Sequence, residues 1–412
     1  MTAVRNRAVT VRRVYLDNNA TTPVAPEVFE AMKPYLLEDY GNASSIHWFG
    51  QRAKNAVEKA RQQVAKLLIA RPGEVIFTSG GTEADNAAIF GIVQAARVAH
   101  PHIITTRIEH HAVLNTAQAL EKQGVDVTYL GVGTGGVVDP ADVRRAIRPE
   151  TVLVSIMHAN NEIGTIQPLE EIGAIAREHD IYFHTDAVQS AGKIPVDIEK
   201  LGVDLLSLSA HKLNGPKGVG ALYVRRKSPR VQITAQMDGG GHERGMRSGT
   251  LNVPGIVGLG EACALCQAEM PAESKRMAFL RDKLRDKLQS ELDETYINGT
   301  FEHRLPNNLN ISFAYVEGES LLMGINEIAV SSGSACTSAT LEPSYVLKAL
   351  GAGDDLAHSS IRFGLGRFNT EEEVDYVAAK VIDVVKKLRE LSPLYEMAKE
   401  GIDLSKVQWA AH

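Results

Sequence analysis

Residues 203–220, VDLLSLSAHKLNGPKGVG, decide the fold: an apolar strand pattern runs into Ala210, His211 and Lys212 and then into a glycine- and proline-rich turn. Similar β-branched runs alternate with helical patterns over the first two thirds of the chain. These runs are EVIFTS (74–79), HIITTR (102–107), VDVTYLG (125–131), TVLVSIMH (151–158), IYFHTDA (181–187) and GALYVRR (220–226). The alternation predicts an α/β fold with a mixed, largely parallel sheet that helices cover on both faces.

The pattern changes after about residue 262 to long amphipathic helices with one short strand pattern, LPNNLNISFAYV (305–316). A chain of 412 residues exceeds what one hydrophobic core usually serves, so two domains are expected. We predict a large domain over 14–262, and a smaller α+β domain over 263–412 to which residues 1–13 also belong. In the last long helix, Thr370 and Glu373 predict a capping box.

Composition narrows the classes of partner. Forty-four basic and fifty acidic residues give a net charge of −6, which offers no electrostatic reason to expect nucleic acid or an anionic membrane. No stretch approaches the roughly 20 apolar residues that cross a bilayer, and the start lacks the apolar centre of a secretory signal. We expect a cytoplasmic protein. A basic start that is free of acid until Asp17 keeps a trimmed organellar leader as the alternative.

Three cysteines in so long a chain cannot form a disulfide framework and agree with a reducing compartment. Cys263 and Cys266 form a C-x-x-C pair, but this spacing also places both on one face of an apolar helix. No second pair of metal ligands follows them. We therefore expect buried packing, with a redox or metal role as the alternative.

Lys212 stands at the end of a predicted strand, where parallel sheets bind their ligands. A lysine beside a pocket can form a Schiff base with an aldehyde, and pyridoxal phosphate (PLP) is the usual aldehyde. Asp186 ends another predicted strand and could supply the carboxylate that keeps the pyridine nitrogen of PLP protonated. Taken alone, Lys212 is more often an exposed loop cation and Asp186 a helix N-cap.

Other polar loops follow the predicted strands. In SGGTEADN (79–86), backbone N–H groups at a glycine-rich turn before a helix make an anion site that suits the phosphate of PLP. His110, in RIEHHAV (107–113), has the position to stack on a ring and to move protons. Asn161 and Gln189 are ordinary loop amides until they are placed beside this set.

Two further residues lie in the predicted smaller domain. Cys336, in AVSSGSACTSATLEPSYVL (329–347), sits among small residues, a setting that favours a reactive thiol over a packed one. Arg362, in SSIRFGLGRF (359–368), could hold a substrate carboxylate bidentately with its planar fork, and a structural ion pair is the alternative.

As a set these residues resemble the cysteine desulfurases of the IscS/NifS group, over nearly the whole chain. The resemblance rests on YLDNNATTPV (15–24), SGGTEADN, HANNEIG (158–164), HTDAVQS (184–190), SAHKLNGPKG (209–218), GGGHERGMRSGT (239–250), VSSGSACTSATLEPSYVLKALG (330–351) and SSIRFGLGRF. It implies the PLP-dependent aminotransferase-like fold, fold type I. The SSGSACTS segment is the most specific part, because it matches the cysteine loop of the first class of these enzymes.

The resemblance also implies roles for single residues. Lys212 would hold PLP, Asp186 would pair with the ring nitrogen, His110 would stack on the ring and act as acid or base, and Gln189 would contact the ring hydroxyl. Asn161 would contact both cofactor and substrate. The phosphate would be held by a set to which the neighbouring subunit of a homodimer contributes the last member: Gly81, Thr82, Ser209, His211 and Thr250.

The implied reaction converts L-cysteine to L-alanine. Arg362 would bind the substrate carboxylate, and Cys336 would take the sulfur as a persulfide. Cys336 would pass the sulfur to an IscU-like iron–sulfur scaffold protein, with which it could transiently ligate a [2Fe–2S] cluster, and to other acceptors that include tRNA thiolation. The tail LSKVQWAAH (404–412) resembles a scaffold-docking segment. The alternatives are a selenocysteine lyase or another PLP-dependent aminotransferase-like enzyme.

Overall fold

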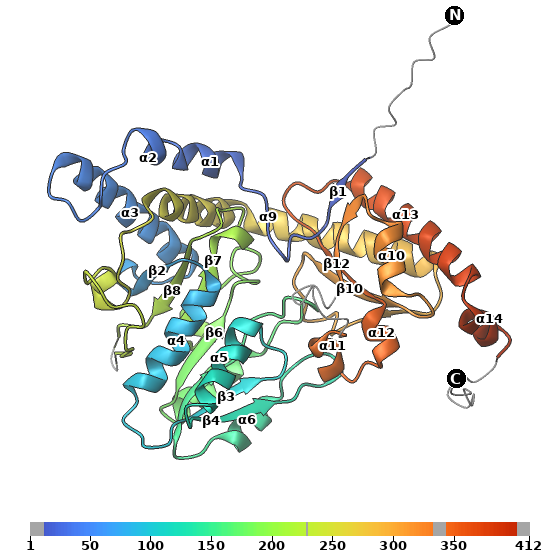
Figure 1. Cartoon of the computed structure of the whole chain (residues 1–412), viewed down its shortest axis with the longest axis horizontal. Helices are drawn as coiled ribbons and strands as arrows, with labels where there is room; N and C mark the ends of the chain where they lie inside the picture. Colours follow the sequence, from blue (N-terminus) through green and yellow to red (C-terminus); the bar gives the residue numbers. More distant parts are fainter. Residues whose placement is uncertain (1–11, 228–229, 333–342, 402–412) are drawn as a thin grey trace, which may run out of the picture.

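The computed structural model describes residues 12–227, 230–332 and 343–401. A seven-stranded sheet and a four-stranded sheet lie in two halves, and one long helix runs along both (Figure 1). Among the described residues, no helix has both the length and the apolar character that a membrane span requires.

The larger sheet has the strand order β2-β8-β7-β6-β5-β3-β4. β8 pairs antiparallel with both of its neighbours, and every other pair is parallel. The strands are β2 Val75–Thr78, β3 His102–Thr106, β4 Asp126–Leu130, β5 Thr151–Ser155, β6 Tyr182–Asp186, β7 Leu205–Ser209 and β8 Gly220–Val224. Each predicted run forms one of these strands, so the mixed, largely parallel α/β sheet is confirmed.

Helices cover both faces of this sheet because neighbouring strand residues point to opposite sides. Ile76 and Ile103 pack with residues of α4 and α5, whereas Phe77 and Ile104 belong to the core that includes α3, α7 and α9. The helices of this half are α1 Pro26–Met32, α2 Pro34–Leu37, α3 Trp48–Leu67, α4 Gly81–Ala95, α5 His111–Glu121, α6 Pro140–Ala146, α7 Leu169–Glu178, α8 Ile198–Leu201 and the first part of α9 Val253–Glu291.

The smaller half is built on an antiparallel sheet in the order β12-β13-β10-β9, with its own core. Its strands are β9 Thr295–Ile297, β10 Asn308–Phe313, β12 Ser331–Ser332 and β13 Ser360–Gly364. Its helices are α10 Gly318–Gly324, α11 Tyr345–Ala349, α12 Asp354–His358, α13 Glu371–Glu390 and α14 Pro393–Lys399. The predicted capping box of α13 is confirmed, because Thr370 and Glu373 each accept from the other's backbone N–H.

The helix α9 belongs to both halves. Cys263 and Cys266 lie in the core of the larger half, whereas Leu280 and Leu284 lie in the core of the smaller one. The expected burial of the C-x-x-C pair is therefore confirmed. The predicted division between 14–262 and 263–412 falls inside this continuous helix, and it stays a prediction.

The described chain begins in the smaller half, where β1 Val14–Tyr15 pairs in parallel with β11 Ile328–Ala329. It then crosses to α1 in the larger half (Figure 1). Residues 17–22 make this crossing, so the N-terminal segment lies where the two halves meet.

A buried ion pair fixes the segment 239–250 against the larger half. Arg61 of α3 donates from both Nη atoms to Glu243, at 2.7 and 2.8 Å, and the side chains are only 4% and 2% exposed. Glu243 also accepts from the backbone N–H of Phe77 in β2 at 2.8 Å. Glu243 and Arg244 both have positive φ angles, 48° and 61°, so the pair holds a strained turn.

Removing one member of this pair leaves the other charge buried and unpaired. We expect Glu243→Ala to lower the free energy of unfolding by about 3–5 kcal/mol. Chemical denaturation of the two proteins measures this loss. A double variant, Arg61→Met with Glu243→Leu, should recover much of it, and an equally unstable double variant would contradict the assignment of the loss to the unpaired charge.

Candidate active site

A cavity of about 390 Å³ opens at the carboxyl ends of β6 and β7 and at the start of α4. Ten of the twelve predicted site residues line it: Gly81, Thr82, His110, Asn161, Asp186, Gln189, Ser209, His211, Lys212 and Arg362. A larger hollow of about 930 Å³ lies between residues 131–142, 166–171 and 302–304, and none of the predicted residues lines it. The predicted catalytic and binding residues therefore lie together in the smaller of these two cavities.

Lys212 follows β7 in a short 3₁₀ turn, Ala210–Lys212. Its Nζ donates to the backbone carbonyl of Ala20 at 2.7 Å and to that of Asn19. Both carbonyls belong to the crossing segment 17–22. The backbone carbonyl of Lys212 in turn accepts from the buried Lys193 amine at 3.2 Å. The reactive amine is thus held in place from the side of the smaller half.

Asp186 ends β6, and one carboxylate oxygen accepts from the backbone N–H of Val188 at 2.9 Å. Burial raises the pKa of Asp186, and the nearby His110 and Lys212 oppose this rise. Asp85 of α4 also lines the cavity, and its pKa is raised by burial and by the charge of Asp186. Two buried carboxyl groups that line one cavity disfavour double ionisation, so a cation beside Asp186 favours its charged form.

His110 caps the N-terminus of α5, where its Nδ1 accepts from the backbone N–H of Ala112 at 3.1 Å. This bond leaves Nε2 as the protonated nitrogen of the neutral ring. Burial lowers the pKa of His110, and the charge of Asp186 opposes the decrease. A neutral imidazole with a fixed tautomer suits proton transfer near neutral pH.

The start of α4, which lines the cavity, can bind an anion. Gly81 and Thr82 begin the 15-residue helix α4, whose first N–H groups have no partner within the helix. Gly81 cannot be replaced without movement, because an added Cβ would lie 2.8 Å from Val188 Cγ2. His211 contacts the Thr21 hydroxyl at 3.1 Å, and burial lowers its pKa to about 4, so it is neutral at pH 7.

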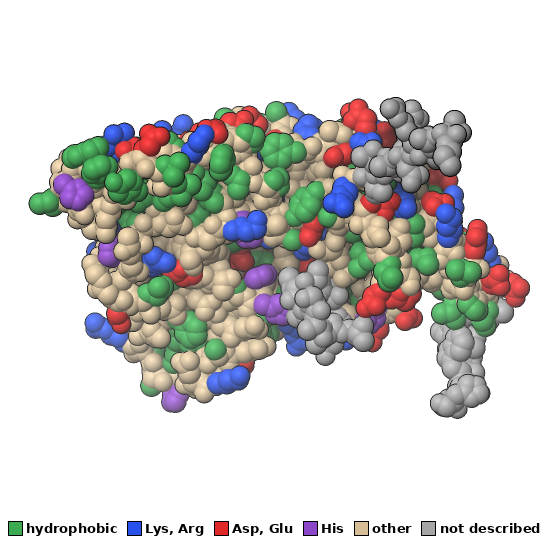
Figure 2. All heavy atoms as spheres, turned by 45° about the horizontal axis from the view of Figure 1, so that its top comes forward, with side chains coloured by type: hydrophobic (Ala, Val, Ile, Leu, Met, Phe, Trp, Pro, Cys, Tyr) green, Lys and Arg blue, Asp and Glu red, His purple; other side chains and the backbone are tan. Residues whose placement is uncertain are grey.

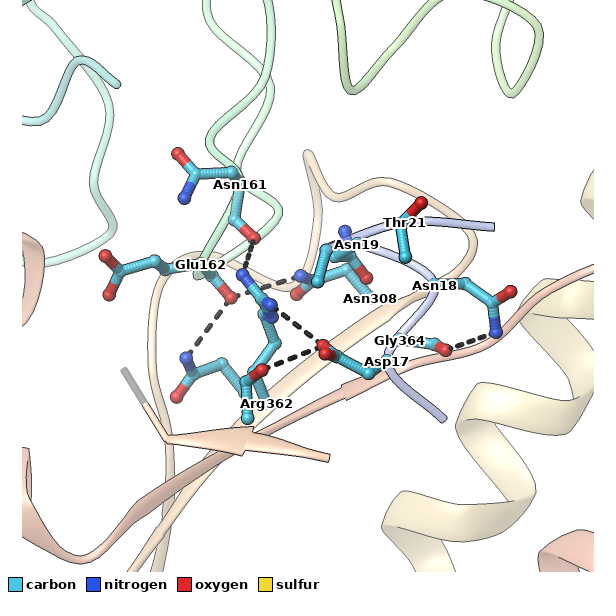
Figure 3. A network of polar contacts seen from close by, with 12 residues as sticks. Asp17, Asn18, Asn19, Thr21, Asn161, Glu162, Asn308, Arg362 and Gly364 are labelled. Carbon is cyan, nitrogen blue, oxygen red and sulfur yellow. Dashed lines mark hydrogen bonds and ion pairs between the residues drawn. The ribbon is translucent and has the colours of Figure 1, made fainter. Parts of the chain in front are cut away.

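Arg362 lies on β13, and its guanidinium enters the cavity from the smaller half (Figure 3). Its Nη1 donates to the backbone carbonyl of Asn161 at 3.1 Å. Among the described residues, four buried polar atoms of cavity-lining side chains lack a hydrogen-bond partner: Asn19 Oδ1, Asp85 Oδ1, Asn161 Oδ1 and Arg362 Nε. Buried polar atoms are rarely left unpaired, so these atoms favour a bound polar ligand.

Comparison with known proteins agrees with this geometry. The aminotransferase class-V family model matches residues 14–377. The chain belongs to the class-V aminotransferase family.

Relatives within the family have high identity to this chain. A protein of Anaeromyxobacter dehalogenans named cysteine desulfurase IscS is 59% identical over 398 residues, 96% of this chain and 98% of that one. Its namesake from Pseudomonas putida is 58% identical over 402 residues, 97% and 99% of the two chains. The solved structure of a NifS-like protein has a TM-score of 0.85 and 41% identity, over 91% of this chain and 100% of the other. A structure described as SspA in complex with cysteine has a TM-score of 0.78 and 39% identity, over 87% and 100%.

Membership in the class-V aminotransferases confirms the predicted fold and implies PLP as the cofactor. The cavity residues fit this cofactor. Lys212 offers an amine, Asp186 a buried carboxylate for a ring nitrogen, and α4 an N-terminus for a phosphate. The buried polar atoms without partners supply further contacts.

Two predicted residues are not part of the described cavity. Thr250 is exposed and does not line it. Cys336 lies outside the described residues. The described residues on either side of it are close to the site: Ser331 lines the cavity, and the Ser344 hydroxyl donates to the buried carboxyl of Glu162, the neighbour of Asn161.

Sequence reasoning did not single out several residues that line the cavity, namely Asp17, Asn19, Ala20, Asp85, Met157, Val188 and Ser331. The polar stretch DNNATT (17–22) directly after a short strand was a usable signal for the first three. For Asp85 the signal was weaker, because an acid in the first turns of a helix normally serves the helix dipole.

Glu162 makes stability depend on pH. Burial raises its pKa to about 7, although the Ser344 hydrogen bond and the charge of Arg362 oppose the rise. The folded protein therefore binds more protons than the unfolded chain between the ordinary glutamate value of 4.5 and about 7, and stability falls as pH rises through this window. Glu162→Gln removes this dependence and keeps an acceptor for Ser344.

We expect Glu162→Gln to melt at a higher temperature than wild type at about pH 8. The difference in melting temperature should vanish near pH 4.5, the ordinary pKa of glutamate. Thermal denaturation across this pH range measures it. A constant difference at every pH would contradict a role for this titration.

Proposed function

We propose that this protein is a PLP-dependent cysteine desulfurase, which converts L-cysteine to L-alanine and moves the sulfur onto Cys336. The observation that carries the proposal is the single cavity in which Lys212, Asp186, His110 and Arg362 lie together. The name and identity of the relatives support it, as does the similarity to a NifS-like structure and to one described as a complex with cysteine.

The proposed chemistry divides among the residues of the cavity. When bound, PLP draws electrons from the substrate's Cα and so makes its proton acidic. Lys212 removes this proton, and the carbonyls of Asn19 and Ala20 keep its amine close to the reacting carbon. Asp186 supplies the negative charge for the ring nitrogen, Gln189 contacts the ring hydroxyl, and His110 donates or accepts protons on the other side.

The proposed substrate contacts lie at the junction of the halves. Arg362 binds the carboxylate of L-cysteine, and the unpartnered amide oxygen of Asn161 accepts from a donor of the substrate or cofactor. Thr82, Ser209 and His211 hold the phosphate with the backbone of Gly81.

The sulfur transfer needs Cys336 as a thiolate. A new S–S bond forms between Cys336 and the substrate sulfur, while the bond between that sulfur and the substrate's Cβ breaks. The electron pair of the broken bond stays with the substrate carbons. Cα regains the proton that Lys212 removed, Cβ takes up a further proton, and the product leaves as alanine. His110 is a suitable source of this proton. The product on the enzyme is a persulfide, ready for a second thiol acceptor.

We further propose that the persulfide sulfur goes to an IscU-like scaffold protein for iron–sulfur cluster assembly and to acceptors that lead to tRNA thiolation. Cys336 would be a transient ligand of a [2Fe–2S] cluster shared with the scaffold. The segment 404–412, which resembles a docking tail, lies outside the described residues. A cytoplasmic location fits these partners and the free thiols of Cys263 and Cys266.

A homodimer is also proposed. The helices α1 and α2, the loop after α2 and the start of α3 expose an apolar patch, visible along the upper left of Figure 2, made of Phe29, Leu36, Leu37, Tyr40, Ile46 and Trp48. A patch of this kind marks an interaction surface, and a second copy of the chain is the partner that the family resemblance implies. Thr250 is exposed in its own chain and free to reach the phosphate site of that copy.

Purified wild-type protein should release alanine and sulfide from L-cysteine in the presence of a thiol reductant, and Cys336→Ser should release almost none. Amino-acid analysis and sulfide detection measure both products. Loss of turnover in Lys212→Ala controls for release that does not depend on the enzyme. Equal activity of wild type and Cys336→Ser would instead favour the alternatives, a selenocysteine lyase or another aminotransferase-like enzyme.

Mixing two impaired variants tests the shared phosphate site. Thr250→Ala should weaken PLP retention in its own homodimer, and Lys212→Ala should abolish turnover. A mixed dimer of the two contains one site with an intact Lys212 and an intact Thr250 from the neighbour, so activity should return. A mixture of wild type with the Thr250→Ala, Lys212→Ala double variant gives mixed dimers without a complete site. Failure of the first mixture to regain activity would contradict the arrangement in trans.

A further inference from the structure

Asp17 is a charged residue of the cavity to which the proposed chemistry gives no role. It follows β1 in the crossing segment, and its backbone lies beside Gly364, two residues after Arg362 on β13. One carboxylate oxygen accepts from Arg362 Nη2 and from the Ser331 hydroxyl, each at 2.9 Å (Figure 3 shows the arginine contact). The Asp17 side chain is 18% exposed and that of Arg362 is 5% exposed.

The contacts of Arg362 leave some of its guanidinium N–H groups available for a ligand. Asp17 and the Asn161 carbonyl each accept from one Nη atom, on two sides of the guanidinium. The group has five N–H donors, and Nε, although buried, has no hydrogen-bond partner among the described residues. The remaining donors suit a second carboxylate, because guanidinium groups bind carboxylates through paired N–H groups.

We propose that Asp17 is a positioning residue that orients Arg362 for the α-carboxylate of an amino-acid substrate. This inference rests on the proposed function and deepens it. It implies that the site, at the junction of the two halves, recognises its substrate by a free α-carboxylate. A long arginine side chain loses considerable rotamer freedom on ordering. Asp17 and Asn161 fix the guanidinium before the substrate arrives, so binding need not supply that ordering.

The crossing segment connects the carboxylate-binding Arg362 to the amine of Lys212. Asp17 holds Arg362 through its side chain, and three residues along the chain the carbonyl of Ala20 holds Lys212 Nζ at 2.7 Å. The amide of Asn19 donates to Gln189 and its carbonyl accepts from the same side chain, which fixes the segment to the larger half. One short stretch of backbone therefore sets the spacing between the carboxylate site and Lys212.

Removing the Asp17 carboxylate should raise the KM for L-cysteine. We expect Asp17→Ala to raise the KM for L-cysteine about ten- to a hundredfold, because a charge-assisted hydrogen bond that orients Arg362 is lost. Asp17→Asn keeps an acceptor but loses the charge, and should raise KM about tenfold. In both variants kcat should change less than KM, since the groups at the reacting carbon are untouched.

Steady-state kinetics of the PLP-loaded enzymes, with PLP content and melting temperature recorded for each, make this test. The matched control is Asp293→Asn, which weakens another aspartate–arginine pair of the smaller half, Asp293 with the buried Arg389 at 2.8 Å. This pair lies outside the cavity, so the control should lower stability without a rise in KM.

A double-variant cycle separates orientation of Arg362 from a general structural role. If Asp17 acts through Arg362, then Asp17→Asn should add no further loss of cysteine affinity in an Arg362→Ala background. Binding of cysteamine, an amine and thiol without a carboxylate, should be equal in wild type and Asp17→Asn when it is followed by the change in cofactor absorbance.

Additive effects of Asp17→Asn and Arg362→Ala on KM would overturn the proposal, as would equal losses for cysteine and cysteamine. A lower KM in Asp17→Ala would also overturn it, because Asp17 would then compete with the substrate carboxylate. Failure of the proposed function itself is distinguishable, since wild type would then yield neither alanine nor sulfide.

Discussion

The site depends on one constraint: parallel strands bring their carboxyl ends to the same edge of the sheet. Asp186 ends β6 and Lys212 follows β7, so adjacent parallel pairing puts a carboxylate and an amine on the same side of one cavity. The same edge holds the N-terminus of α4, which follows β2. The order and direction of the strands therefore bring the Asp186 carboxylate, the Lys212 amine and the anion site of α4 to one edge of the sheet.

The second half of the molecule completes the site. Arg362 reaches the cavity from β13, and α9 joins the two cores through one continuous helix. The crossing segment 17–22 contacts both, because Asp17 binds Arg362 and the carbonyls of Asn19 and Ala20 bind Lys212. Arg362 and Lys212 thus both donate to acceptors of one short segment of the chain, which fixes their position relative to each other.

Much of this could be predicted from the sequence. Local patterns were sufficient for the seven strands of the larger sheet, because β-branched runs between glycine-rich loops have few other stable arrangements. Strand order and the reversed β8 were not predictable, since they depend on pairing between distant segments. The role of Asp17 was also hidden, because its partner Arg362 is 345 residues away. The proposed role of Thr250 cannot be derived from a single chain, because the phosphate that it would contact lies in the neighbouring subunit.

The central claim is that sulfur leaves L-cysteine and is bound by Cys336. A single turnover without reductant, followed by mass analysis of the peptide that contains Cys336, tests it most directly. The account predicts that this peptide gains the mass of one sulfur atom in wild type and that Lys212→Ala shows no gain. An unmodified Cys336 peptide after alanine has formed would contradict the account, because the sulfur would then have left by another route.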